Sequence, residues 1–375
     1  MDFQLTEEQA LLRDTARELL GRSYDAEKRN KVIETELGWS RDVWRQLAET
    51  GLLGLSFTEE NGGMGAGPVE TAAVLTEIGR RLAPEPLLDA VLLPGWLIEA
   101  AGSAEQCAKI LPQVAEGASL LGFAHAEPGS RWPDTDLATV ASHDESGWRL
   151  TGSKNPVPHG DCADQLVVSA KLPDGGTGLF LLDPAADGVA RTGYRTYDGL
   201  RGAQLDFSSA PAEPLGEATD AATHIEAAVV RAQDALCAEA VGAMDEALRL
   251  TAEYLKARKQ FGVPLAKFQT LTQRAADMYV SLEMARSMST YLTMSIEDDR
   301  IDTVIASRAK LQVARSARHI GQEAVQLHGG IGITAEYPVS HYVARLTAIE
   351  QTFGGAREHV QVLSARLSDY ARVEL

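Results

Sequence analysis

Two segments in the last third of the chain place glycines beside side chains that can donate hydrogen bonds. The first spans residues 254–269 and reads YLKARKQFGVPLAKFQ; the second spans residues 326–339 and reads QLHGGIGITAEYPV. In the first, we expect a helix to end near Gln260, Gly262 and Pro264 to turn the chain, and a second helix to begin near Phe268. In the second, the glycines permit a close approach of the backbone to a ligand.

The residue types that most often bind metals do not form a metal-binding pattern. Cys107, Cys162 and Cys237 lie far apart, without the CxxC or Cys/His spacing of a zinc site. We expect buried thiols in a reducing compartment and no disulfide framework. His125 and His159 are residue types that can act in catalysis, but neither has a visible partner in the sequence, so a surface or structural role is expected. No metal is predicted.

Composition narrows the class of protein. The chain has 375 residues, 45% of them hydrophobic, and a formal net charge of −18. A surface so acidic argues against nucleic-acid partners and anionic membranes. The first ten residues are acidic and polar, unlike a signal peptide, and no apolar run approaches the length that spans a membrane. A cytoplasmic protein without nucleic-acid or membrane partners is therefore expected.

The spacing of apolar residues, which indicates the secondary structure that must position these segments, changes twice along the chain. Apolar residues recur at helical spacing from residue 5 to about 117, where Thr6 can cap the first helix. Short alternating runs punctuated by Gly, Pro and Asp follow from 120 to 214 and predict strands. Long helical segments return over 223–257, 269–296, 303–329 and 340–370, and predict a bundle that dominates oligomerisation. The predicted domains are 1–118, 119–216 and 217–375.

The two segments and this layout together resemble the acyl-CoA dehydrogenase family over the whole chain. The resemblance implies an N-terminal all-α domain, a middle antiparallel β domain and a C-terminal four-helix bundle. It also implies FAD as cofactor, with this chain contacting the ADP portion of a flavin bound mainly by a neighbouring subunit. An arginine fork can pair with a pyrophosphate, and glycine-lined backbone lets the adenosine end approach. The residues that match the family's contacts are Arg258, Gln260, Phe261, Phe268, Gln326, Leu327, Gly329 and Gly330.

The sequence departs from the family at the catalytic base. The family removes an α-proton from an acyl-CoA thioester with a glutamate while the β-hydride passes to the flavin. In most members that glutamate stands seventeen residues after the Glu of the E-Y-P-V segment, which here is Phe353. In others it stands ten residues before the glycine equivalent to Gly242, which here is Ala232. Neither side chain can accept a proton. Glu350 and Glu239 are the remaining, less favoured candidates.

The segments that meet the flavin ring in the family are altered too. Where the family has T-E-P-x-x-G-S-D, residues 125–131 read HAEPGSR, with Ala126 in place of the threonine. Where it has G-x-K-x-W-I-T-N-G, residues 152–160 read GSKNPVPHG, with Pro156 and Pro158 in place of the aromatic and the hydroxyl. Proline supplies neither an aromatic face nor a hydrogen-bond donor.

The residues that differ from the family are the catalytic base and the contacts to the flavin ring, whereas the residues that contact the ADP portion match the family. The sequence resembles the base-lacking subunit of actinobacterial α2β2 acyl-CoA dehydrogenases that act on steroid side-chain CoA thioesters. The implied partners are a catalytic acyl-CoA dehydrogenase paralogue, an acyl-CoA substrate and an electron-transfer flavoprotein as acceptor. Two alternatives stay open: a self-sufficient homo-oligomeric enzyme with an unusual base, and a non-catalytic acyl-CoA-binding scaffold.

Overall fold

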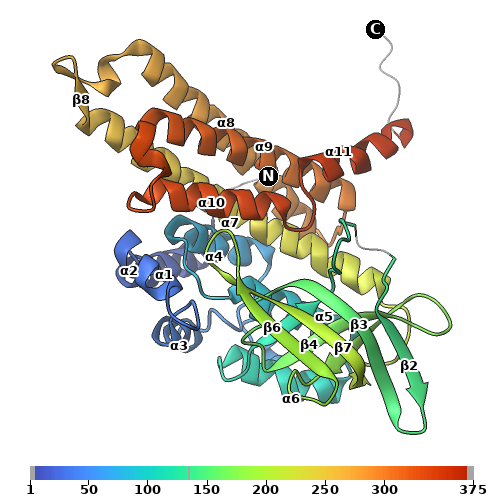
Figure 1. Cartoon of the computed structure of the whole chain (residues 1–375). Helices are drawn as coiled ribbons and strands as arrows, with labels where there is room; N and C mark the ends of the chain where they lie inside the picture. The colour runs from blue at the N-terminus through green and yellow to red at the C-terminus, as the bar shows by residue number, and fades with distance from the viewer. Residues whose placement is uncertain (1–4, 134–135, 370–375) are drawn as a thin grey trace. The chain divides into compact units, whose positions relative to one another are not determined.

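The computed structural model describes residues 5–133 and 136–369 (Figure 1). The N-terminal part is helical: α1 (Glu7–Ser23), α2 (Ala26–Ile33), α3 (Arg41–Glu49), η1 (Glu59–Asn61), α4 (Pro68–Arg81), η2 (Leu88–Leu92), α5 (Leu93–Ala101) and α6 (Ala104–Ala115). Seven strands follow: β1 (Leu121–Ala124), β2 (Val140–Asp144), β3 (Gly147–Pro158), β4 (Gln165–Lys171), β5 (Thr177–Leu182), β6 (Val189–Arg195) and β7 (Arg201–Pro214). The last part comprises α7 (Ala222–Ala257), β8 (Lys259–Gln260), β9 (Val263–Pro264), η3 (Leu265–Lys267), α8 (Gln269–Glu297), α9 (Thr303–His328), η4 (Gly329–Ile333), α10 (Pro338–Gln351), α11 (Ala356–Ala365) and η5 (Leu367–Asp369).

The order of helices, strands and helices confirms the predicted architecture. The first helix begins where the sequence predicts, because the Thr6 hydroxyl accepts a hydrogen bond from the Gln9 amide at 3.2 Å and the Gln9 side chain accepts one from the Thr6 amide at 2.9 Å. The domain boundaries at 118 and 216 stay predictions. Residues 1–4 and 370–375, at the outer ends of the first and third predicted domains, lie outside the described residues.

The strands form one sheet that closes on itself. Its order is β1-β4-β2-β3-β7-β5, with β5 pairing back to β4 and β6 pairing β7. Most pairs are antiparallel, as predicted, but β1 and β2 each pair in parallel with β4. Strand β3 shifts register against β7 between Lys154 and Val157, within one of the segments that the sequence singles out.

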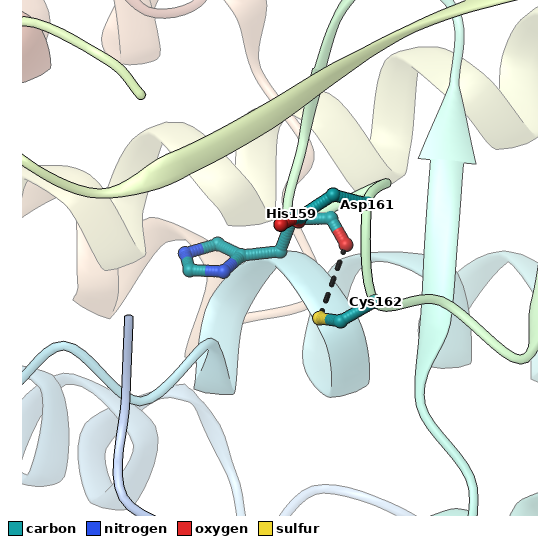
Figure 2. A group of neighbouring side chains, drawn as sticks. All are labelled: His159, Asp161 and Cys162. Carbon is teal, nitrogen blue, oxygen red and sulfur yellow. Dashed lines mark hydrogen bonds between the residues drawn. The ribbon is translucent and has the colours of Figure 1, made fainter. Parts of the chain in front are cut away.

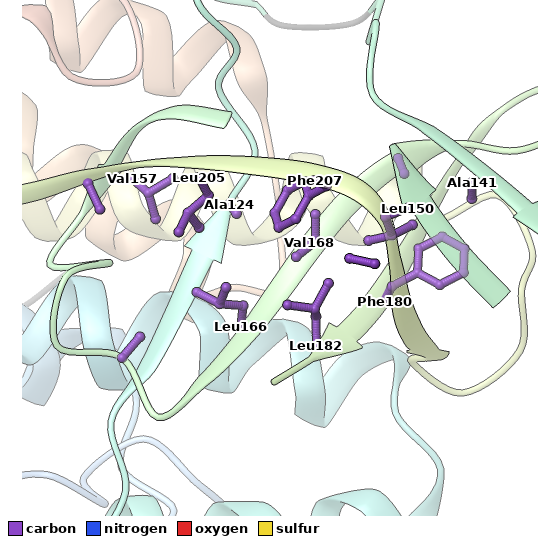
Figure 3. Close-up of a cluster of buried hydrophobic side chains, with 14 of the residues drawn as sticks. Ala124, Ala141, Leu150, Val157, Leu166, Val168, Phe180, Leu182, Leu205 and Phe207 are labelled. Atoms are coloured by element: carbon purple, nitrogen blue, oxygen red, sulfur yellow. The ribbon is translucent and has the colours of Figure 1, made fainter. Parts of the chain in front are cut away.

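The closed sheet surrounds an apolar core (Figure 3). The core residues come from alternating positions of facing strands, as expected where one face of each strand is buried. Those labelled in Figure 3 are Ala124, Ala141, Leu150, Val157, Leu166, Val168, Phe180, Leu182, Leu205 and Phe207. This core fixes β1, which residues 125–131 follow, and β3, which contains residues 152–158.

The chain forms two compact units. One comprises the chain up to Ala26, Ala72–Ala83 and the chain from Gln233 onward; the other comprises Glu27–Thr71 and Pro84–Ala232. In the first unit, α4 and α7 cross with their backbones in contact. A Cβ on Gly79 would lie 1.9 Å from the Glu239 carbonyl oxygen, and a Cβ on Gly242 would lie 1.9 Å from that of Thr76. Only glycine permits this approach.

The last predicted helical segment, 340–370, is two helices. Helix α10 ends at Gln351 and α11 begins at Ala356. Between them Phe353 adopts φ +52° and Gly354 φ +97°, left-handed conformations that an α-helix cannot contain. The break falls at the position where most of the family carries its base. Within residues 5–133 and 136–369, no helix is long and apolar enough to cross a membrane.

Candidate functional site

Three aromatic rings bring the two C-terminal segments together. Tyr254 lies in the last turn of α7, His328 ends α9 and Tyr337 immediately precedes α10. The ring centroids of Tyr254 and His328 are 4.5 Å apart, those of His328 and Tyr337 4.9 Å, and those of Tyr254 and Tyr337 6.1 Å. We call these residues the aromatic cluster. Two segments whose first residues are 72 positions apart (326 − 254) therefore meet where α7 and α9 end and α10 begins.

Arg258 leads from α7 into the β8–β9 hairpin. Its backbone is fixed, because its amide donates to the Tyr254 carbonyl and its carbonyl accepts from the Leu265 amide, both at 2.8 Å. Its exposed guanidinium has no hydrogen-bond or ion-pair partner in the described part of the chain. Phe261, at φ +54°, is 92% exposed, and its ring lies 6.2 Å from that of the half-buried Phe268. The hairpin thus presents a cation and an aromatic ring to solvent.

The charge around this hairpin opposes that of the chain. Residues 254–269 hold four cations and no carboxylate, whereas the whole chain has 53 acidic and 35 basic residues. The exposed Gln260 adds an amide, which donates to the Lys259 carbonyl at 2.9 Å. A local cationic patch on an acidic protein attracts an anionic ligand or partner. The four cations are Lys256, Arg258, Lys259 and Lys267.

The second segment offers open backbone directly after His328 of the aromatic cluster. Gln326, Gly329 and Gly330 are exposed, while Leu327 is buried and anchors the end of α9. Gly329 adopts φ +68°, but Gly330 does not, and a Cβ on either would meet nothing within 4 Å. Neither packing nor backbone strain therefore requires glycine at 330. A partner-free guanidinium, local positive charge and open glycine backbone fit the pyrophosphate and adenosine end of FAD.

The positions of the family's base hold no proton acceptor. Ala232 is fully buried on α7. The next residue, Gln233, donates from Nε2 to the Phe353 carbonyl oxygen at 2.9 Å. The buried Lys310 donates to the Ile349 carbonyl at 2.7 Å, at the end of α10. The turn that would carry a glutamate is therefore held in place, although its side chain is a phenylalanine.

The two remaining carboxylate candidates are both paired with arginine. Glu239 accepts two hydrogen bonds from Arg345, at 2.6 and 2.9 Å, and Glu350 is bonded to Arg318. Both glutamates are buried. A buried carboxylate whose oxygens accept hydrogen bonds from a guanidinium is poorly placed to take a substrate proton. The geometry favours a structural role for Glu239 and Glu350.

Residues 125–131 are bonded to Lys154. The fully buried ammonium of Lys154 donates to the His125 carbonyl and to Glu127 Oε1, both at 2.8 Å. The Glu127 carboxylate also accepts from the amides of Ala138 at 2.7 Å and Thr139 at 2.9 Å. Burial alone would raise the pKa of Glu127, but the bond from Lys154 and these amides outweigh it and lower the pKa to about 2. The Glu127 carboxylate and the His125 carbonyl of this segment are therefore engaged in hydrogen bonds within the chain.

His125 has a partner that the sequence did not reveal. Its Nδ1 lies 2.8 Å from the Ser169 hydroxyl, and its ring stacks on Phe123 with centroids 5.2 Å apart. Burial, and then the charge of Lys154, lower its pKa to about 4. The ring is therefore neutral at pH 7 and structural, as expected from the sequence.

We expect His125 to make the protein less stable in mild acid. Its folded pKa of about 4 lies below its ordinary value of 6.5, so the unfolded chain binds the proton first and stability falls as the pH drops from 6.5 towards 4. Between pH 7 and pH 5, these two pKa values correspond to a loss of about 2 kcal/mol. In urea unfolding at pH 7 and pH 5, His125→Asn should reduce the difference between the two pH values by that amount. An unchanged difference would contradict the assignment.

His159, Asp161 and Cys162 lie in one turn, with potential ligand atoms within 4.8 Å of one another (Figure 2). The Cys162 thiol donates to the His159 carbonyl oxygen at 3.3 Å, and burial raises its pKa to about 12. Burial also raises the pKa of Asp161, against the opposing charges of Arg201 and Arg191. A cation here would have to displace the thiol proton and face two guanidinium groups. This turn suits a protonated thiol, and we assign no metal to it.

The sequence interpretation missed the residues that join the two segments. Tyr254 and His328 stand inside the quoted segments, four residues before Arg258 and directly before Gly329. Their position next to both expected contacts was the available signal. The partner of His159 was missed as well. The His159 Nε2 atom lies 3.9 Å from a carboxylate oxygen of Asp89, which stands in η2, far from His159 in the sequence.

Known proteins resemble the chain over nearly its full length. Residues 6–118 match the acyl-CoA dehydrogenase N-terminal domain and residues 229–366 match the C-terminal domain. The acyl-CoA dehydrogenase IpdE2 of Mycolicibacterium smegmatis is 30% identical over 367 residues, covering 97% of this chain and all of the relative. The Tcur3481–Tcur3483 steroid ACAD has 33% identity and a TM-score of 0.89, with 97% and 98% of the two chains covered. The ChsE4–ChsE5 complex of Mycobacterium tuberculosis has 26% identity and a TM-score of 0.91, with 99% and 100% covered.

These matches confirm the predicted fold, reaction class and cofactor at the level of the family. The family comprises FAD-dependent oxidoreductases that act on the CH–CH bond of acyl-CoA thioesters. The chain belongs to the acyl-CoA dehydrogenase family.

Proposed function

We propose that this chain is the non-catalytic subunit of a heteromeric acyl-CoA dehydrogenase, arranged as α2β2 with a catalytic paralogue. The observation that carries the proposal is an asymmetry between its two kinds of site. The 254–269 segment holds four cations, and the backbone at Gly329 and Gly330 is open. The base positions, in contrast, are Phe353 and Ala232, and the two nearby glutamates are paired with arginines. A chain of this kind can help to hold a flavin but cannot abstract the substrate proton itself.

Each part of the open surface has a role towards a flavin whose ring lies in the partner. Arg258 binds the pyrophosphate, and Gly329 and Gly330 let the adenosine end approach. FAD, when bound, supplies the acceptor for the β-hydride. The proton at the α-carbon is taken by a glutamate of the partner. The contacts proposed for this chain are Arg258, Gln260, Phe261, Phe268, Gln326, Gly329 and Gly330, and Leu327 supports them from its buried position.

The names of two similar solved structures support the proposal of a partner chain and of a substrate class. Both solved structures described above are named as pairs of different chains, and one of them as a steroid ACAD. We therefore propose an acyl-CoA thioester with a steroid side chain as substrate, and an electron-transfer flavoprotein as the acceptor. The bulky acyl group is proposed by analogy with that steroid ACAD.

The decisive experiment is purification of the chain alone and with an acyl-CoA dehydrogenase paralogue that retains the glutamate. We expect the chain alone to elute without substantial flavin. With the partner it should form a 2:2 complex that is yellow, with one FAD per pair of unlike chains. The measurements are mass by light scattering and the flavin-to-protein absorbance ratio after gel filtration.

Other outcomes identify the alternatives. A yellow, active chain in the absence of any partner would establish the self-sufficient enzyme. A colourless chain that binds acyl-CoA, and neither gains flavin nor assembles with a paralogue, would establish the scaffold.

A further inference from the structure

His328 is the buried member of the aromatic cluster. Its side chain is 4% exposed and packs against the rings of both Tyr254 and Tyr337, which also contact each other. Its Nδ1 lies 2.8 Å from the Ala324 carbonyl oxygen. A carbonyl can only accept, so Nδ1 carries the proton. Burial lowers the pKa of the ring below 6.5, which keeps it neutral at pH 7.

The other ring nitrogen of His328, Nε2, carries no proton in this neutral tautomer. Within residues 5–133 and 136–369, the buried Nε2 has no hydrogen-bond partner. A neutral ring with Nδ1 protonated leaves Nε2 as an acceptor without a proton, which costs less in an apolar setting than an unpartnered cation. The ring is thus fixed by one hydrogen bond at one edge and by two aromatic contacts on its surface.

The His328 ring connects the two segments that we propose hold the ADP end of the flavin. Tyr254 stands one turn before Arg258, and its carbonyl accepts the Arg258 amide hydrogen bond at 2.8 Å. His328 directly precedes Gly329, and η4 folds back over it: a Cβ on Gly332 would lie 2.9 Å from the His328 Cβ. A displacement of the His328 ring would therefore move the glycine backbone relative to the arginine.

We propose that His328 is a positioning residue that sets the Gly329–Gly330 backbone relative to Arg258 before FAD arrives. The inference rests on the proposed function and adds how that surface is kept in its binding geometry. Ordering a loop during binding lowers affinity, and a loop ordered beforehand avoids that cost. The aromatic cluster orders this surface through packing and one hydrogen bond, without a ligand.

The test is FAD affinity of the assembled complex, measured by titration of the flavin-free complex and flavin fluorescence. His328→Ala should weaken FAD binding about tenfold, because it removes both the ring contacts and the Nδ1 hydrogen bond. His328→Phe keeps the ring contacts and should recover most of the affinity. At saturating FAD, kcat should equal that of the wild type, since the ring touches neither substrate nor base. His319→Ala, on the same helix, is the matched control and should leave the affinity unchanged.

The outcomes separate this inference from the proposed function. If Arg258→Ala loses flavin and His328→Ala does not, the positioning role is wrong while the shared site stands. If neither variant loses flavin, the shared site itself is wrong. An equal loss in His328→Ala and His319→Ala would also overturn the inference. Should His328→Ala fail to fold, Tyr337→Leu removes one ring contact from the same cluster and must lower FAD affinity for the inference to survive.

Discussion

The chain purified alone and supplied with FAD and an acyl-CoA thioester is expected to turn over at least about a hundredfold more slowly than its complex with the catalytic partner. A general base contributes roughly 10²- to 10⁴-fold to such a reaction. Phe353 and Ala232 occupy both positions where the family places that base. The measurement is steady-state reduction of an artificial electron acceptor, together with anaerobic bleaching of the flavin in a single turnover.

Two variants test whether an unusual base replaces the missing one. Glu350→Gln is the cleaner of them, because its partner Arg318 is 58% exposed and stays solvated when the ion pair is lost. Arg345, the partner of Glu239, is 16% exposed, so Glu239→Gln leaves a largely buried guanidinium and should destabilise the fold by about 3 kcal/mol or more.

Neither variant should change the rate of the assembled complex at a temperature where it is folded. Robust turnover by the lone chain that disappears in Glu350→Gln would show that this chain carries its own base. Loss of turnover in Glu239→Gln alone is informative only if circular dichroism shows the variant to be folded.

The periodicity of the sequence predicted the fold because long helices and short strands leave different apolar spacings. It placed α7, α8 and α9 to within a residue or two. It predicted one helix over 340–370 and missed the break signal in the Gly354-Gly355 pair, a dipeptide that often marks a turn. The parallel pairing of β1 with β4 was equally invisible, since pairing partners are chosen by the closed sheet and by no local pattern.

The candidate site also contains residues that the sequence could indicate and contacts that it could not. Arg258 and the glycine pair stand in contiguous segments, so the sequence was enough to predict them as flavin contacts, and they stay predictions. The ion pairs of Glu350 and Glu239 join residues 32 and 106 positions apart, so the sequence left both open as bases. His125 was also without a visible partner until the strands brought Ser169 to it. Contacts that depend on tertiary packing are beyond single-sequence reasoning, and these decide which carboxylates are structural.

The guanidinium of Arg258 is the group whose loss should most weaken the flavin. It is the exposed side chain of the hairpin with the geometry to pair with a pyrophosphate, and no described residue competes for it. A charge-assisted hydrogen bond contributes about 1.5–3 kcal/mol. Arg258→Ala should therefore lower FAD retention roughly ten- to hundredfold.

Arg258→Lys should restore only part of that retention, because an ammonium cannot reproduce the two parallel hydrogen bonds of the arginine fork. Lys267→Ala provides the matched control, since it removes one positive charge from the same 254–269 segment and keeps the fork. The measurement is the flavin-to-protein ratio of the co-expressed complex after gel filtration. Equal losses in Arg258→Ala and Lys267→Ala would reduce the role of Arg258 to general attraction. Full retention in Arg258→Ala, with loss on substitution of His159 in the ring-side segment, would mean that this chain holds the flavin ring and not its ADP end.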